Sequence, residues 1–459
     1  MVTMTRKRKV SHSPNPKGQE SFHDTSPIMA YRNLVSHSSV QFRADVEFHE
    51  KPRQVFIGIV LLGILGFFAA SNSGDNIGLE KSVRTVCLGV VVLIVFYCML
   101  QSKDGLMIRP HPMLWRAIHG LALTYAILLA VILILPVEQG ISFVHDALLP
   151  DIAGGSIHVL KKQQTATLQR LDPLECRISF PNIMRQVTSI WFIAHGLGWW
   201  GKMCLLRDWS MCLTYSVAFE VTELSLVWLI PEFEECWWDS LFMDMLGANM
   251  IGLYLGTVTL KWLACRRYEW EPHDTNKPLL HHFSAFLKKF TPFSWSDYVW
   301  PSDPKCWILS SMAWIGALLL EVNSFLILHA LVIRPSHWFN VARLCLLGAQ
   351  GAQSVPEWYE YVRGNTERIG HNTWLMFLIA TLELMIGFKY GRGGQPYSSK
   401  VPPFDTVACL CAFAILWSAW YSISAFRGYK GERRSPNWLL VLHVVSFIPL
   451  MLLTRGWVF

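Results

Sequence analysis

Charged side chains are scarce in this chain of 459 residues. Asp, Glu, Lys and Arg together account for 16% of the residues, whereas 52% are hydrophobic. This balance excludes an ordinary soluble domain, and the long apolar runs indicate a polytopic membrane protein. The net charge of +7 lies mostly outside those runs, where basic residues suit lipid head groups. We therefore predict no nucleic-acid partner.

Common catalytic and metal-binding signatures are also missing. The eleven cysteines include no C-x-x-C pair, which excludes the zinc and thioredoxin-like motifs built on it. The sequence has no D-x-x-D-G segment followed by further spaced aspartates, as CDP-alcohol phosphotransferases have. Paired H-x-K segments of the phospholipase D kind and the repeated H-x-x-H boxes of di-iron desaturases are absent as well. These absences narrow the classes of enzyme to which the chain could belong.

The apolar runs predict an all-α fold with about ten transmembrane helices. Residues 1–52 are expected to form a disordered, basic cytosolic tail, residues 53–430 a multi-span catalytic membrane domain, and residues 431–459 a C-terminal extension. The expected spans are Val55–Ser71, Thr85–Leu100, Ala117–Pro136, Val187–Leu206, Trp209–Pro231, Ser240–Cys265, Ile308–Ile333, His337–Pro356, Thr373–Gly391 and Thr406–Ala425, with Trp438–Leu453 as a possible eleventh.

Two local features predict how some of these helices pack. Only Arg207 and Asp208 separate the fourth span from the fifth, so these two helices are expected to form a tight hairpin. Gly252 and Gly256 in the sixth span have the G-x-x-x-G spacing that lets a neighbouring helix approach closely.

The distribution of basic residues predicts the orientation in the membrane. A cytosolic N-terminal tail makes the basic segment 266–305 cytosolic by alternation, as the positive-inside rule requires. The same count places segments 137–186 and 232–239 in the lumen. Cys176 and Cys236 lie in these two segments, so a disulfide between them is possible.

The segment from Phe219 to Gly256 sets acidic residues among residues apolar enough for the membrane interior. Each carboxylate at mid-bilayer costs roughly 2.5–3.5 kcal/mol, so several together need a compensating partner, and a bound cation is the obvious one. Oxygen ligands in this number suit calcium better than zinc. Glu220 and Glu223 share one helix face, as do Glu235 and Asp239. The remaining acids are Asp244, Glu232 and Glu234, and for the last two a solvated loop is the alternative.

His195 and Lys202 stand seven residues apart in the fourth span, on one stripe of the helix. A lone histidine in a span is more commonly a packing residue, but the next helix presents Glu220 and Glu223 at similar depth. An imidazole oriented by a carboxylate can remove a proton from a hydroxyl, and a cation and a lysine can neutralise a phosphate. These groups are the parts of a phosphodiester exchange site.

The segment Arg109-Pro110-His111-Pro112 lies between the second and third spans. Two interpretations are open for it. It could cap the third span, or Arg109 and His111 could bind a phosphate.

The acidic segment and its surroundings closely resemble the eukaryotic base-exchange phosphatidylserine synthases. The likeness extends over roughly residues 50–425, and the Glu-Cys-Trp-Trp-Asp run is its most specific part. The matching residues are His195-Gly196, Gly198-Trp199, Lys202, Glu220-Val221-Thr222-Glu223-Leu224, Pro231, Glu235-Cys236-Trp237-Trp238-Asp239, Asp244, Asn249, Arg109-Pro110-His111-Pro112, Glu321-Val322-Asn323-Ser324-Phe325, His329, Glu383 and Lys389-Tyr390-Gly391.

The resemblance implies a role for each matching site residue. His195 and Glu220 are expected at the reacting centre. It also implies a multi-pass endoplasmic reticulum enzyme, reasonably a homodimer, that exchanges the head group of phosphatidylethanolamine or phosphatidylcholine for L-serine. The residues expected in its calcium-dependent site are Glu223, Glu235, Asp239, Asp244 and Asn249.

The chain departs from the family pattern in two places. Glu232 stands where relatives are expected to have Asn, which leaves the local ligand set open. The apolar run after residue 430 leaves the side of the C-terminus open.

Other classes of function fit the same residues. In a cation channel or transporter the acids would line an ion path, although the two halves show no convincing internal repeat. A lipid-binding scaffold without turnover is a third possibility. Within the enzyme hypothesis, His195 acts either as a base toward the serine hydroxyl or as a nucleophile toward phosphorus.

Overall fold

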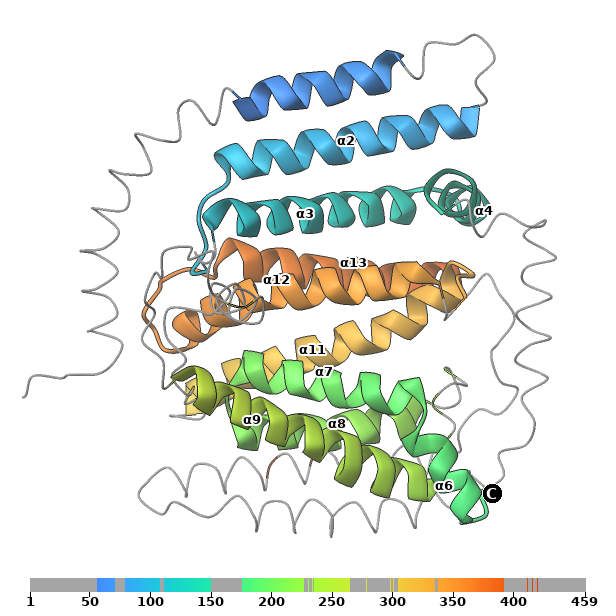
Figure 1. Cartoon of the computed structure of the whole chain (residues 1–459), viewed down its shortest axis with the longest axis vertical. Helices are drawn as coiled ribbons and strands as arrows, with labels where there is room; N and C mark the ends of the chain where they lie inside the picture. Colours follow the sequence, from blue (N-terminus) through green and yellow to red (C-terminus); the bar gives the residue numbers. More distant parts are fainter. Residues whose placement is uncertain are drawn as a thin grey trace, which may run out of the picture. The chain divides into compact units, whose positions relative to one another are not determined.

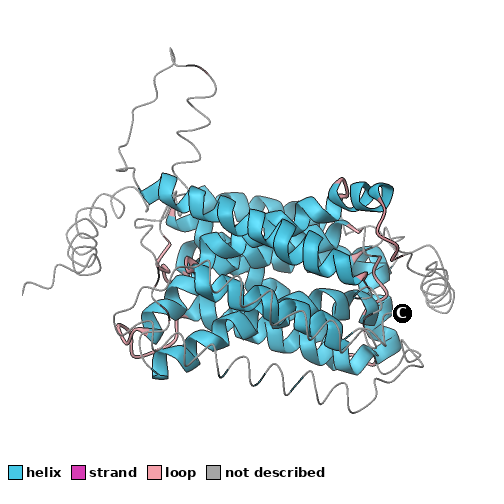
Figure 2. Cartoon of the chain, turned by 90° about the horizontal axis from the view of Figure 1, so that it is seen from below, coloured by secondary structure: helices cyan, strands magenta, loops and turns pink. Residues whose placement is uncertain are grey.

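The computed structural model describes residues 56–70, 79–107, 111–149, 176–226, 235–264, 304–334 and 337–391, and a few single positions between and beyond them. All of these residues belong to the unit Gln54–Phe459. The tail predicted for residues 1–52, Arg109, and the acids Glu232 and Glu234 lie outside the described residues. The regular elements of the described part are all helices (Figure 2), so the predicted all-α class is confirmed there.

The described helices follow one another along the chain as shown in Figure 1. An apolar helix covers Phe56–Ala70. The others are α2 (Leu79–Gln101), α3 (Pro112–Ile134), α4 (Val137–Ser142), the π-helix η1 (Phe143–Leu148), α6 (Phe180–Val187), α7 (Ile190–Leu206), α8 (Trp209–Leu226), the π-helix η4 (Asp239–Asn249), α9 (Met250–Ala264), α11 (Pro304–Ala330), α12 (Trp338–Val362) and α13 (His371–Gly391).

Within the described residues, five helical stretches are long and apolar enough to cross a membrane. They are Glu80–Gln101, Pro112–Ile134, Asp239–Trp262, Cys306–Ala330 and His371–Gly391, which shows several of the predicted spans. The fourth, fifth and eighth predicted spans form α7, α8 and α12. These three helices are not among the five stretches. The tenth and eleventh fall almost entirely outside the described residues. Ten spans therefore stay a prediction.

The predicted hairpin between α7 and α8 is confirmed. Arg207 ends α7 in the left-handed backbone conformation, with φ of 51°. The Asp208 carboxylate then accepts a hydrogen bond of 2.8 Å from the Met211 N–H and so caps the start of α8. A left-handed residue followed by an N-capping aspartate reverses the chain in the fewest residues, because one ends a helix and the other begins the next.

Small residues bring α9 against α7, as the G-x-x-x-G spacing predicts. A Cβ atom added to Gly252 would lie 2.7 Å from the Trp199 Cβ, and one added to Gly256 would lie 2.5 Å from the Met203 Cβ. Trp199 itself is completely buried. A larger side chain at either glycine would therefore push the two helices apart.

Two apolar cores contact different halves of α11. One core joins α3, α11 and α13, and the other joins α7, α8 and α9 with the inner faces of α11 and α12. A buried ion pair locks the first core, because Arg343 donates to both oxygens of Glu383 at 2.7 and 2.6 Å and Tyr125 donates to one of them at 2.6 Å. Bidentate pairing of this kind fixes the register of α12 against α13.

The helix directions place the acidic segment at one end of the bundle. Phe233 packs on Phe325 near the end of α11, and His145 bonds the Leu331 carbonyl at 2.8 Å beyond that same end. Segment 137–149 and Phe233 therefore lie at one end, as the alternation of spans predicts. The predicted disulfide between Cys176 and Cys236 is present there, whereas the loop 102–107 and residues Arg207 and Gly370 lie at the other end.

Candidate active site

The predicted acids come from α8, from the segment that precedes η4, and from η4 itself. Glu220 on α8 is completely buried, and Asp239 at the start of η4 is 7% exposed. Glu223, Glu235 and Asp244 are half-buried. The helices that carry them lie beside α7 and α9, the green helices of Figure 1. An apolar helical framework thus surrounds these carboxyl groups.

Asn249 ties the acids of α8 to η4. Its Nδ2 donates to the Ser216 hydroxyl at 2.8 Å and to Glu220 Oε1 at 3.5 Å. Ser240, the second residue of η4, also contacts the Glu220 carboxylate. Neutral hydrogen-bond donors therefore hold one oxygen of Glu220, and the other oxygen is left without a partner among the described residues.

The remaining acids gather around this pair. Glu235 and Asp244 share a hydrogen bond between their side chains. Glu223 interacts electrostatically with Glu220, Glu235 and Asp244. The structure thus brings together the acids that the sequence predicts in one site. Asp239 lies at the edge of the group, where the Gln186 amide of α6 donates to its carboxylate.

This arrangement concentrates negative charge. Glu235 lies before the membrane-crossing helix, and its burial, together with the carboxylates of Asp244 and Glu220, raises its pKa well above the ordinary value. A carboxyl group in that position accepts a nearby cation readily, because the cation relieves both the burial cost and the repulsion.

His195 faces this group from α7. Its side chain interacts with Asn249, and its ring centroid lies 6.3 Å from that of Phe219. The Nε2 atom is buried and has no hydrogen-bond partner among the described residues. The sequence predicted that the Glu220 carboxylate orients the His195 ring directly. In the structure Asn249 contacts both His195 and Glu220 and so lies between them.

Lys202 lies further along α7 and has a partner that the sequence did not predict. Its Nζ lies 2.5 Å from Glu321 Oε1 on α11. A lysine inside a span requires such an acid. The sequence suggested the acids of α8 as partners of Lys202, because they are nearer to it along the chain. Glu321 was singled out only as a residue that matches the family. If Lys202 binds phosphate as predicted, it does so while it is paired with Glu321.

His111 belongs to another part of the bundle. Its Nδ1 accepts a hydrogen bond of 3.1 Å from the Met113 N–H and caps α3, which is the first of the two interpretations left open above. Because α3 packs against α2, α12 and α13, His111 is not brought together with the acids. A phosphate-binding role for it and for Arg109 stays a prediction.

The donor atoms can be compared with what calcium requires. Glu220 Oε2, Glu235 Oε2 and Asn249 Oδ1 are buried oxygens without a hydrogen-bond partner in the described residues, and such oxygens suit this ion. Among those same residues, no three His, Cys, Asp or Glu side chains are already arranged around a single ion position. The described side chains therefore do not form a complete calcium site by themselves, and calcium binding here stays a prediction.

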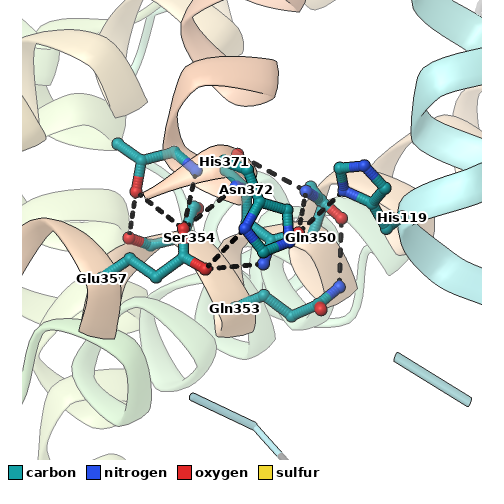
Figure 3. A network of polar contacts seen from close by, with 8 residues as sticks. His119, Gln350, Gln353, Ser354, Glu357, His371 and Asn372 are labelled. Carbon is teal, nitrogen blue, oxygen red and sulfur yellow. Dashed lines mark hydrogen bonds and ion pairs between the residues drawn. The ribbon is translucent and has the colours of Figure 1, made fainter. Parts of the chain in front are cut away.

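A second polar network occupies the opposite end of the bundle (Figure 3). Glu357 of α12 accepts hydrogen bonds from the Asn372 side chain at 2.7 Å and from the Asn372 and Thr373 N–H groups at 3.0 and 3.1 Å. The Asn372 amide oxygen meets His119 of α3 at 2.9 Å and Gln350 at 3.1 Å. These reciprocal bonds join α3, α12 and α13, so we assign this network to the stability of the fold.

The fold and the site together define a helical membrane protein with a carboxylate cluster beside a half-buried histidine. Comparison with known proteins gives the family. The family model for phosphatidyl serine synthase matches residues 110–391, and the chain belongs to this family. The match includes the acidic site, His195 and Lys202.

Curated relatives agree with this assignment. The chain is 28% identical over 346 residues to CDP-diacylglycerol--serine O-phosphatidyltransferase 2 of Oryza sativa, covering 73% of this chain and 81% of the relative. It is 30% identical over 342 residues to phosphatidylserine synthase 2 of Homo sapiens, covering 72% and 68%. The mouse phosphatidylserine synthase 2 is 31% identical over 348 residues. The protein is thus a transferase that makes phosphatidylserine.

Proposed function

We propose that the protein makes phosphatidylserine by calcium-dependent base exchange. L-serine replaces the head group of phosphatidylethanolamine or phosphatidylcholine, and ethanolamine or choline is released. The observation that carries this proposal is the set of unpartnered buried oxygens on Glu220, Glu235 and Asn249 beside the unpartnered Nε2 of His195. The lack of a D-x-x-D-G segment supports a phospholipid donor over a CDP-activated one.

His195 provides the group that moves the proton. As a general base, Nε2 takes the proton of the serine hydroxyl while the serine oxygen bonds to phosphorus and the bond from phosphorus to the old head group breaks. The protonated imidazole then returns the proton to the departing alkoxide. As a nucleophile, Nε2 would instead bond to phosphorus while the bond from phosphorus to the old head group breaks, and the serine oxygen would displace Nε2 in a second step. The proton that the serine hydroxyl loses then balances the one that the departing head group takes up. Asn249 orients the ring in either route.

The acids organise the phosphate. Glu220, Glu223, Glu235, Asp244 and Asn249 would hold the ion, with Asp239 at the margin near Gln186. A calcium ion held there would supply positive charge to the phosphate oxygens. Lys202 of α7 adds a second positive charge, and its Nζ lies 4.8 Å from the ring centroid of Tyr215 on α8.

Family membership favours the enzyme over the channel, transporter and scaffold alternatives. By the same family likeness we propose an endoplasmic reticulum location, with a cytosolic N-terminal tail and a site that opens toward the lumen. The Cys176–Cys236 disulfide at the acidic end supports the lumenal assignment, because disulfides persist in that oxidising compartment. We also propose a homodimer.

The donor and the role of His195 are tested together. The purified full-length protein is reconstituted in vesicles of phosphatidylethanolamine, phosphatidylcholine or CDP-diacylglycerol, and the incorporation of labelled serine into lipid is measured. Base exchange predicts product and released amine with the first or second donor, and none with the third. The names of the relatives do not decide which lipid is the donor, because the rice protein is named for CDP-diacylglycerol and the human protein names no donor.

The His195→Ala variant should lose about 10²–10⁴-fold in rate, the usual range for a general base. His371→Ala, in the polar network at the other end of the bundle, is the matched control and should keep most activity. Near wild-type incorporation by His195→Ala contradicts the assignment of this residue. Incorporation that requires CDP-diacylglycerol contradicts base exchange.

A further inference from the structure

The ammonium group of Lys202 lies in a box of aromatic rings closed by a carboxylate. Nζ is 3.7 Å from the ring centroid of Trp199, 4.8 Å from that of Tyr215 and 5.4 Å from that of Phe219. Glu321 Oε1 lies 2.5 Å from the same atom. Aromatic faces attract cations and a carboxylate accepts N–H bonds, so this box has the chemistry of an ammonium-binding site.

Glu321 has acceptor capacity left after it binds Lys202. A carboxylate offers about four lone-pair sites. The Oε2 atom is buried and has no hydrogen-bond partner within 3.5 Å among the described residues, and the Tyr215 hydroxyl makes a longer hydrogen-bond interaction with the same carboxylate. The Glu321 side chain is 26% exposed through its other atoms, so a small ligand reaches this carboxylate but must displace a neighbouring side chain to contact Oε2.

The box adjoins the acidic site. Glu223 interacts electrostatically with Glu321, and Lys202 does so with both Glu220 and His195. Lys202 therefore belongs to both groups of residues. A molecule held at Glu321 would lie next to the reacting groups.

We propose that Glu321 binds the ammonium group of L-serine through Oε2 while Oε1 retains Lys202. This inference rests on the proposed function, in which serine is the acceptor that must present its hydroxyl to His195. A second cation at this carboxylate is favoured by the surplus negative charge of Glu220, Glu223 and their neighbours. Glu321 thereby selects an amino alcohol over an alcohol without an amine, and Lys202 holds the Glu321 side chain in position.

The test measures how the rate of serine incorporation depends on serine concentration for the reconstituted wild-type protein and for Glu321→Gln. The amide keeps the shape of the side chain and removes its charge. We expect the KM for serine to rise about 10-fold or more, as the loss of a charge-assisted hydrogen bond implies, with a much smaller change in kcat. Glu321→Asp should recover part of the affinity. Glu367→Gln, an exposed acid at the other end of the bundle, is the control and should match the wild type.

A competition experiment on the wild-type protein tests the same site without any substitution. Ethylamine carries an ammonium group but no hydroxyl, so it should inhibit competitively with serine, whereas ethanol at the same concentration should not. Glu321→Gln should be less sensitive to ethylamine than the wild type. If that variant does not fold, the competition result on the wild type decides.

The outcomes separate this inference from the proposed function. Serine is the acceptor with a phospholipid donor or with CDP-diacylglycerol, so the comparison is made with whichever donor yields phosphatidylserine. A requirement for CDP-diacylglycerol overturns base exchange but leaves the ammonium site to be judged by KM and by ethylamine. A fall in kcat at unchanged KM, or no inhibition by ethylamine, overturns the ammonium site and leaves Glu321 only as the partner of Lys202.

Discussion

At the scale of single residues, Asn249 is where the contacts of the site meet. It is completely buried. Its amide nitrogen holds Ser216 and Glu220, its side chain meets His195, and its Oδ1 is left without a hydrogen-bond partner in the described residues. Asn249 therefore positions the histidine and the acid relative to each other, and it can also offer an oxygen to a cation.

Replacing Asn249 with Ala should affect both stability and turnover. Ser216 and Glu220 would lose a buried partner, which typically costs about 1–3 kcal/mol. The orientation of His195 would loosen, so we expect kcat to fall at least about 10-fold, within the range that a general base contributes. Thermal unfolding and serine incorporation of the reconstituted variant measure the two effects.

Asn365→Ala is the control for this prediction. Asn365 is exposed near the α12–α13 loop, and its side-chain amide donates to the Glu360 carboxylate at 2.7 Å, so its loss should change neither quantity. A wild-type rate in Asn249→Ala would show that Asn249 does not position the catalytic pair.

At the scale of elements, the segment that carries Glu235 and Asp239 is held from outside. Glu235 and Cys236 lie outside the helices shortly before η4, Asp239 begins η4, and residues 176–187 attach to this part of the chain twice. The disulfide joins Cys176 to Cys236, next to Glu235, and Gln186 of α6 donates to Asp239. These two attachments fix Glu235, which lies outside the helices, and Asp239, which lies at the first residue of η4.

Removal of the disulfide should therefore weaken the acidic site more than the fold. Cys176→Ser frees the Glu235 segment, so the free calcium concentration needed for half-maximal exchange should rise several-fold, while the apolar core around Trp199 stays intact. Treatment of the wild-type protein with dithiothreitol should reproduce the effect. Activity as a function of free calcium measures it.

Cys345→Ser provides the comparison, because Cys345 is an exposed free thiol on α12. It should leave the calcium dependence unchanged. An identical calcium dependence in Cys176→Ser and Cys345→Ser would mean that the disulfide does not hold the ligands in place.

Local features of the sequence predicted the elements well. The two residues between the fourth and fifth spans leave room only for a hairpin, and Gly252 and Gly256 require a close neighbour whatever the fold. The π-helical geometry of η4 was not predicted, because a register change within a helix leaves no clear mark in hydrophobic spacing. Capping by His111 was one of two open interpretations, since Arg-Pro-His-Pro serves both roles equally well.

At the scale of the whole molecule, α11 connects the two apolar cores and delivers Glu321 to the site. The sequence predicted the membrane class and the group of acids, because both follow from local composition. It could not predict the Lys202–Glu321 pair or the place of Asn249 between His195 and Glu220. Those contacts depend on how distant helices pack, and a single sequence does not specify that packing.

The central claim is that the acids beside His195 tolerate the membrane interior because they bind a divalent cation used in head-group exchange. The most direct measurement is the binding of radioactive calcium to the purified protein in phosphatidylethanolamine vesicles, with serine incorporation followed in the same samples. We predict that binding and exchange rise over the same calcium range and that Glu235→Gln shifts both to higher calcium. Full exchange in the presence of a calcium chelator, or unchanged calcium binding when Glu220 and Glu235 are both replaced by Gln, would contradict the claim.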